Sequence, residues 1–236
     1  MAEALSSGRE INKILIRKGL RSELFSQLFQ RIREHGIPYQ FVPVEKLNAL
    51  TKGNHQGVVA QLALIEYKEL EEIIQRTFEA GRDPFVLILD RVTDVRNFGA
   101  IARTAECAGV DILVVPEKES VAITADAIRT SAGALSRVAV ARRKNLNETL
   151  TYLKECGIRI AAVTEKAEKL FYDDDLSGPV ALLLGAEDRG ISPALIQMSD
   201  LQLKIPLKGN IASLNVSVAL GIVAYEVVRQ RGEMNK

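Results

Sequence analysis

Short apolar runs alternate with amphipathic segments along most of this chain. Residues 85–89 and 180–184 contain no polar side chain, which is typical of strands buried on both faces of a sheet. Segments such as 97–108 and 214–231 repeat apolar residues at helical spacing. The predicted strands cover residues 12–17, 39–42, 57–65, 85–89, 112–115, 138–141, 158–163, 180–184 and 201–205, and the predicted helices cover residues 23–34, 44–50, 68–75, 97–108, 125–131, 146–156, 193–198 and 214–231.

Apolar strands separated by helices predict an α/β fold, a parallel sheet with helices on both faces. The first 66 residues alternate within themselves and predict a small α/β domain of their own. Composition then changes: residues 67–83 are rich in charge and end in Gly-Arg-Asp directly before Pro84, so we place the interdomain linker there. Residues 84–236 form the second predicted domain.

Composition narrows the class of protein. At 47% hydrophobic and 26% charged residues over 236 positions, the chain can bury a core and is not disordered. No apolar run approaches the roughly 20 residues that span a bilayer, and no signal peptide opens the chain, so we expect no membrane partner. Cys107 and Cys156 have neither zinc nor C-x-x-C spacing, which predicts a reduced, cytoplasmic protein without a structural metal.

Charge alone does not identify a partner, because the net charge is only +1. Residues 1–66 hold nine Lys and Arg against six Glu, a surplus of three, with Arg17, Lys18 and Arg21 clustered. A solvated face is the simpler interpretation of this surplus, and a patch for phosphates is the alternative.

The stretch 182–190, Leu-Leu-Leu-Gly-Ala-Glu-Asp-Arg-Gly, turns a buried strand into a glycine-bounded loop that carries a carboxylate. Gly185 and Gly190 have P-loop spacing, but Ile191 stands where that motif needs lysine, and no Gly-x-Gly-x-x-Gly occurs. A second loop, 205–217, leads from a short strand into the last helix. Ligands of open α/β sheets sit at such strand ends, so we expect a cofactor here that is not a bare polyphosphate.

A third segment, 89–105, places Asn97 and Arg103 after a strand that ends at Asp90. Small or apolar neighbours surround Arg103 in the sequence, which predicts that its guanidinium projects outward from an otherwise buried part of the helix. From this segment alone, the simpler interpretation is that Asn97 caps the helix and Arg103 makes a surface ion pair.

Together, the three segments resemble a known family. Asn-x-Gly-x-x-x-Arg, then Gly-x-Glu-x-x-Gly, then Ile-Pro-Leu with Ser-Leu-Asn-x-Ser, in that order, resemble the signature motifs of the SpoU/TrmH class of SPOUT RNA ribose 2′-O-methyltransferases. The resemblance covers residues 84–232. Residues 1–66, including His-Gln-Gly-Val-Val-Ala-Gln at 55–61, are similar to the N-terminal RNA-binding domain of the bacterial 23S rRNA guanosine methyltransferases. Each motif alone is weak evidence for this family, but the three motifs in this order are specific to it.

The sequence departs from the family pattern at two places. Val95 stands where many members have proline, which alters the loop before Asn97. The chain also begins late relative to the usual family start, so we expect an N-terminal strand of the small domain to be missing or replaced.

The resemblance implies a fold, a cofactor and a partner. Family members fold the C-terminal part of the methyltransferase domain into a trefoil knot, bind S-adenosylmethionine and dimerise through the knotted domains, with the active site near the interface. The positions that match the family's cofactor contacts are Thr164, Gly185, Gly190, Ile205, Leu207 and Leu214.

The resemblance also implies catalytic positions, namely Asn97, Arg103, Glu187, Ser213 and Asn215. The family arginine is often proposed as the base, but a guanidinium group is protonated below about pH 12. We therefore expect Arg103 to clamp the target phosphate or the 2′-oxygen. Asn97 would orient the ribose and Glu187 would hold this group or relay the proton. Ser213 and Asn215 would complete the polar wall, with helix capping as the alternative.

The resulting hypothesis is a homodimeric 2′-O-methyltransferase that acts on structured RNA, expected to be a guanosine of 23S rRNA, with no DNA partner. Within that class, tRNA is the alternative substrate. From other classes, the alternatives are a catalytically idle RNA-binding assembly factor and a small-molecule methyltransferase. The intact Asn97, Arg103 and Glu187 argue against the first, and the basic N-terminal domain argues against the second.

Overall fold

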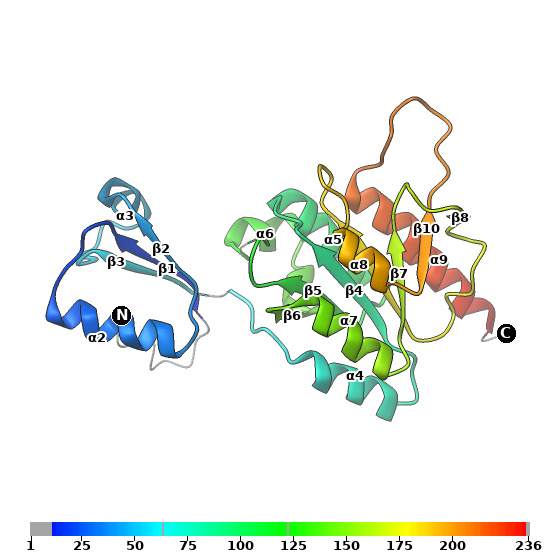
Figure 1. Cartoon of the computed structure of the whole chain (residues 1–236), viewed down its shortest axis with the longest axis horizontal. Helices are drawn as coiled ribbons and strands as arrows, with labels where there is room; N and C mark the ends of the chain where they lie inside the picture. The colour runs from blue at the N-terminus through cyan, green and yellow to red at the C-terminus, as the bar shows by residue number, and fades with distance from the viewer. Residues whose placement is uncertain (1–10, 63, 122, 235–236) are drawn as a thin grey trace. The chain divides into compact units, whose positions relative to one another are not determined.

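The computed structural model describes residues 11–62, 64–121 and 123–234, which divide into two compact units (Figure 1). Unit 1 comprises Met1–Glu66 and unit 2 comprises Tyr67–Lys236. Within the described residues, no helix is both long and apolar enough to cross a membrane.

Unit 1 is a three-stranded mixed sheet with a helix on each face. Its elements are β1 (Ile11–Arg17), α2 (Glu23–Glu34), β2 (Tyr39–Val42), α3 (Val44–Leu50) and β3 (Val58–Leu62). The strand order is β2-β1-β3, with β2 parallel and β3 antiparallel to β1. Successive residues of a strand face opposite sides, so Ile14 and Ile16 pack under α2 while Leu15 packs with Leu47 of α3.

Unit 2 contains a seven-stranded sheet in the order β6-β5-β4-β9-β7-β10-β8, and every pairing in it is parallel. Its elements are α4 (Leu70–Glu79), β4 (Phe85–Asp90), α5 (Val95–Cys107), β5 (Ile112–Pro116), α6 (Ala125–Thr130), η1 (Ala134–Ser136), β6 (Ala139–Arg143), α7 (Leu146–Glu155), β7 (Arg159–Val163), β8 (Lys169–Leu170), β9 (Val180–Gly185), α8 (Pro193–Met198), β10 (Leu201–Lys204) and α9 (Val216–Met234).

Helices cover both faces of this sheet. Buried side chains of α4, α7 and α8 pack on the face that carries Val86, Val114 and Leu183, and α5 lies beside α6 and α9 in a second layer (Figure 1). The interior strand β4 is buried at all six positions; its apolar run 85–89 predicts the first five, and the sixth is the carboxylate of Asp90. The predicted fold, a parallel sheet flanked by helices with a small N-terminal α/β domain, is confirmed.

Several boundaries differ from the prediction. The segment 67–83, expected to be a linker with a helix at 68–75, contains α4 at Leu70–Glu79, whose Leu70 and Ile74 are buried in the core of unit 2. The short β8 and η1 have too few residues for a periodic pattern and were not predicted. The trefoil knot stays a prediction, and the expected loss or replacement of an N-terminal strand concerns residues 1–10, which lie outside the described residues.

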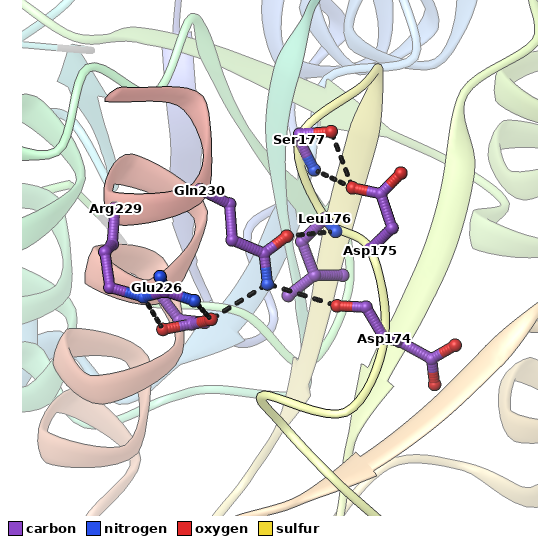
Figure 2. Close-up of polar contacts among 7 residues, drawn as sticks. All are labelled: Asp174, Asp175, Leu176, Ser177, Glu226, Arg229 and Gln230. Atoms are coloured by element: carbon purple, nitrogen blue, oxygen red, sulfur yellow. Dashed lines mark hydrogen bonds and ion pairs between the residues drawn. The ribbon is translucent and has the colours of Figure 1, made fainter. Parts of the chain in front are cut away.

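A polar network fastens the loop before β9 to α9 (Figure 2). The Gln230 side chain accepts a hydrogen bond from the Leu176 backbone N–H at 2.6 Å and donates to the Asp174 carbonyl at 3.1 Å. Gln230 also donates to Glu226 at 2.8 Å, and Glu226 receives two further hydrogen bonds from Arg229 at 2.9 and 2.6 Å. Two turns of α9 are therefore joined to a loop about 50 positions earlier in the chain.

The network lowers the pKa of two carboxyl groups. Hydrogen bonds from Arg229 hold the pKa of Glu226 below its ordinary range, although burial acts in the opposite direction. Hydrogen bonds from the Ser177 hydroxyl and backbone N–H likewise lower the pKa of Asp175. Both groups favour the folded state in their charged form.

Candidate functional site

A pocket of about 290 Å³ lies in unit 2 at the carboxyl ends of β7 and β9. Its walls come from Val163 to Lys166, from the turn 184–191, and from the long loop that connects β10 with α9. The carboxyl ends of parallel strands meet at one edge of a sheet, so segments distant in sequence converge here. This is the location that the glycine-bounded turns predict for a cofactor.

The turn that follows β9 has a shape that only its two glycines allow. The Gly190 N–H donates to the Ala186 carbonyl at 2.7 Å and closes the turn. A Cβ atom at Gly185 would lie 2.1 Å from the Gly190 carbonyl carbon and 2.3 Å from Ile191 N, which is too close for any side chain. Gly190 has φ +62°, a left-handed conformation that costs little only without a side chain.

Two charged residues at the end of β4 hold this turn in place. The Asp90 carboxylate accepts a hydrogen bond from Ser192 N at 2.7 Å, and the Asp90 carbonyl accepts one from Ala186 N at 3.0 Å. Arg91, with φ +58°, donates through Nη2 to Asp90 and to the Gly190 carbonyl, both at 3.2 Å. Local sequence pattern alone does not indicate a function for this pair; its one signal is two adjacent charges directly after an apolar strand.

The turn presents Glu187 to two asparagines from other segments. Glu187 Oε1 accepts hydrogen bonds from Asn97 Nδ2 at 3.2 Å, from Asn215 Nδ2, and from Val216 N at 3.2 Å. The last donor belongs to the first turn of α9, where the helix dipole favours a negative charge. Asn215 Nδ2 also donates to Asn97 Oδ1 at 2.9 Å, which closes a three-residue ring of side chains.

The residue that caps α5 is not the one that the sequence suggests. Asp94, not Asn97, caps α5, because its side chain accepts from Asn97 N at 2.8 Å. Asn97 lies in the first turn, and its amide is free to reach Glu187. Asn215 has the geometry of the capping alternative, because its Oδ1 accepts from Ser217 N at 3.0 Å as an N-cap does, and its Nδ2 joins the ring.

The remaining two predicted catalytic residues are placed apart from this ring. Ser213 is exposed and lines the pocket. Arg103 is an exposed residue of α5 and does not line the pocket. Its neighbours Ile101 and Ala102 are fully buried, which agrees with a guanidinium that leaves a buried surface. Within the described residues Arg103 has no hydrogen bond or ion pair, so the predicted surface ion pair is not formed.

The six residues predicted to bind the cofactor all line the pocket, although their binding role stays a prediction. They are Thr164, Gly185, Gly190, Ile205, Leu207 and Leu214. The aliphatic side chains provide an apolar wall, and the turn provides backbone polar groups. Glu165, Lys166 and Asp188 add charges of both signs at the pocket. An apolar slot with a few polar groups suits a nucleoside better than a bare polyphosphate.

Comparisons with known proteins give matches over nearly the whole chain. Residues 84–225 match the family model described as the SpoU rRNA Methylase family. Residues 2–68 match a second model, described as RNA 2′-O ribose methyltransferase substrate binding. The first match alone covers more than half of the chain, and it contains Asn97, Arg103, Glu187, Ser213 and Asn215.

Individual relatives agree with these matches. A Bacillus subtilis (strain 168) protein, named as a member of the TrmH family of tRNA/rRNA methyltransferases, is 36% identical over 99% of this chain and 94% of its own length. The solved A. aeolicus TrmH/SpoU tRNA modifying enzyme is 31% identical, covers 70% of this chain and 86% of that one, and has a TM-score of 0.60. The SpoU methyltransferase AviRb from Streptomyces viridochromogenes, solved with AdoMet, is 24% identical over 98% of this chain and 87% of that one, with a TM-score of 0.64, which shows a common fold.

Proposed function

This chain belongs to the SpoU rRNA methylase family and is an RNA methyltransferase, and we propose that it transfers a methyl group from S-adenosylmethionine to a ribose 2′-hydroxyl of structured RNA. The observation that carries the proposal is the ring of Asn97, Glu187 and Asn215 beside the pocket. Each of the three family motifs contributes one member. The match of residues 2–68 to a 2′-O ribose methyltransferase substrate-binding model supports ribose as the acceptor.

The pocket fits S-adenosylmethionine by the chemistry of its lining. Ile205, Leu207 and Leu214 would pack against the adenine, and backbone groups of the turn 185–190 would hydrogen-bond the nucleoside. When bound, the cofactor supplies an electrophilic methyl group on a sulfonium, so the protein mainly has to align the acceptor oxygen and remove one proton. Asp90 and Arg91 contribute by fixing the turn.

Glu187 is suited to receive that proton. Its Oε1 is occupied by three donors, whereas no described residue donates to Oε2. The anchored oxygen fixes the direction of the carboxylate, and Oε2 stays available to the 2′-hydroxyl. We assign Asn97 and Ser213 to orientation of the ribose.

Arg103 is assigned to the phosphate or the developing charge on the 2′-oxygen, and we propose that it acts across a homodimer. In one protomer it lies outside the pocket. On α9, which lies beside α5, Val218, Tyr225 and Val228 are exposed while Leu220, Val223 and Val227 are buried. A helix that is apolar on both sides is normally covered on both sides. We propose that a second copy covers this face and places Arg103 of the partner subunit near the pocket.

Two RNA classes fit the family. We propose a guanosine of 23S rRNA as the target, because the motif-bearing domain matches an rRNA methylase model and the chain carries the additional substrate-binding domain. The similarity to a tRNA modifying enzyme favours tRNA as the second candidate. The proposed compartment is the cytoplasm, in keeping with the free Cys107 and Cys156.

The direct test is incubation of the purified protein with methyl-labelled S-adenosylmethionine and, separately, with unmodified rRNA and tRNA. We expect label in one RNA class, recovered after complete digestion as a 2′-O-methyl nucleoside. Label on a base, or no label in either RNA although the cofactor binds, would refute the proposal.

A further inference from the structure

Every aromatic residue of the first 66 positions belongs to one cluster on unit 1. The Phe29 ring contacts Phe25, Tyr39 and Phe41 at centroid distances of 5.5, 5.0 and 6.0 Å, and Tyr39 contacts Phe41 at 5.9 Å. Three of these four contacts are edge-on or tilted, so ring faces are not all used within the cluster.

The cluster is not a closed core. Tyr39 and Phe41 are 42% and 43% exposed, although burial of large aromatic side chains is strongly favourable. Both project from β2, which is the edge strand of its sheet, and they face the same side as Ile14 and Ile16 under α2. The two rings therefore form the open border of the layer between α2 and the sheet.

Positive charge borders this surface at both ends. Arg33 is exposed on α2 one turn beyond Phe29. At the other end, Lys18 is exposed and its backbone N donates to the Val42 carbonyl at 2.9 Å, which places Lys18 at the end of β2, next to Phe41 along the chain direction.

The acidic residues of α2 face elsewhere. Glu23 and Glu34 lie roughly 120° and 140° around the helix from Phe29, at about 100° per residue. Glu34 is hydrogen-bonded to Gln30 at 2.8 Å, on the same outer side. Rings with an arginine at one end and a lysine at the other, and no carboxylate of α2 on the same side, match the chemistry that binds unpaired nucleotides.

We propose that Tyr39 and Phe41, with Phe29 behind them, form a stacking surface for unpaired bases of the RNA substrate. Lys18 and Arg33 contact the adjoining phosphates. The proposal rests on the proposed function, because it assumes that unit 1 delivers RNA. It also specifies which feature of the RNA unit 1 recognises: a loop or single-stranded segment rather than a continuous duplex.

The test compares a labelled single-stranded RNA with a blunt duplex of the same length, both bound to the full chain and followed by fluorescence anisotropy. Tyr39→Ile and Phe41→Ile remove a ring while keeping a residue that favours strands. We expect each to weaken single-strand binding about tenfold and duplex binding less than about twofold. Phe41→Tyr keeps the ring and is expected to bind as the wild type does. Leu24→Ala, at a residue that is 80% exposed elsewhere on α2, is the matched surface control.

A measurement on the wild-type protein does not depend on the folding of any variant. Single-stranded RNA that contains 4-thiouridine is photo-crosslinked to the full chain and the attachment sites are mapped. We expect crosslinks at Tyr39 or Phe41, and crosslinks confined to other residues would overturn the inference, as would unchanged single-strand binding by both isoleucine variants. If the wild type methylates RNA but the crosslinks and the isoleucine variants do not implicate Tyr39 and Phe41, only the stacking surface is refuted. If the wild type binds no RNA, the proposed function is refuted as well.

Discussion

The side-chain amide of Asn215 donates a hydrogen bond of 2.9 Å to the side-chain oxygen of Asn97, across 118 positions of sequence. Both asparagines also donate to Glu187 Oε1. The first turns of α5 and α9 are therefore joined through the turn that follows β9. Three sequence segments, each of which is weak evidence for a site by itself, thus place their polar side chains in one hydrogen-bonded group beside the pocket.

Replacing Glu187 separates its two assigned roles. Glu187→Gln keeps an oxygen that can accept from Asn97, Asn215 and Val216 N but cannot take up a proton at neutral pH. We expect normal cofactor binding and a loss of transfer of about 10²-fold or more, measured with labelled S-adenosylmethionine. Glu187→Ala also removes the anchor and should lower the free energy of unfolding by about 1 kcal/mol. If Glu187→Gln transfers methyl at the wild-type rate, Glu187 is only an anchor.

Gly185→Ala should abolish cofactor binding. The added Cβ would lie 2.1 Å from the Gly190 carbonyl carbon, and backbone atoms on both sides must move to relieve the clash. Gly178→Ala is the matched control, because a Cβ there meets no atom within 4 Å and its φ is not left-handed. Calorimetric titration with S-adenosylmethionine checks both variants. Unchanged affinity in Gly185→Ala would show that the turn does not hold the cofactor.

Acid should weaken the attachment of α9. The pKa of Glu226 is lowered in the folded state by its hydrogen bonds with Arg229, so its contribution to stability is present above the ordinary glutamate pKa of about 4.3 and is lost as the pH falls through the lower folded value. We expect Glu226→Gln to lower the melting temperature at pH 7 and the difference from the wild type to shrink at more acidic pH. Glu72→Gln, at an exposed position of α4, is the control. A difference that does not vary with pH would contradict this assignment.

The exposed apolar face of α9 predicts self-association. Tyr225 is 51% exposed and Val218 is 50% exposed, so a charge at Tyr225 should interrupt a dimer with little effect on the protomer core. We expect Tyr225→Glu to convert a dimer into a monomer in light-scattering measurements and to lose methyl transfer. Tyr172→Glu places the same change at a residue that is 48% exposed elsewhere in unit 2 and should stay dimeric. A wild-type monomer that is fully active would end the proposal that Arg103 acts across an interface.

Hydrophobic periodicity predicts most elements correctly because burial alone determines where their apolar residues fall. β4 is buried from Phe85 to Leu89, and its apolar run predicts this directly. Helix starts were less predictable, since several residues near each start can cap: Asp94 rather than Asn97 caps α5, and α9 begins at Val216 instead of 214. The charge of segment 67–83 predicts a linker with a helix at 68–75; the helix is present as α4, and its buried Leu70 and Ile74 fix it to the core of unit 2.

The candidate site was accessible from sequence only in part. The three motifs indicated Asn97, Glu187 and Asn215 separately, but not that one carboxylate oxygen receives hydrogen bonds from both asparagines. Local pattern does not indicate Asp90 and Arg91, because their effect depends on distant contacts: Arg91 with Gly190, 99 positions later, and Asp90 with Ser192, 102 positions later. Such contacts are set by the order of strands in the sheet, which local periodicity does not contain.

The measurement that tests the central claim most directly is methyl transfer by Arg103→Ala, made together with cofactor titration on the same preparation. Arg103 is exposed, lies outside the pocket and has no partner within the described residues, so its removal should leave the fold and cofactor affinity unchanged. We predict wild-type binding of S-adenosylmethionine, a loss of transfer of about 10²-fold or more, and 2′-O-methyl nucleosides only in the wild-type reaction. Ribose methylation at the wild-type rate by Arg103→Ala would contradict the account.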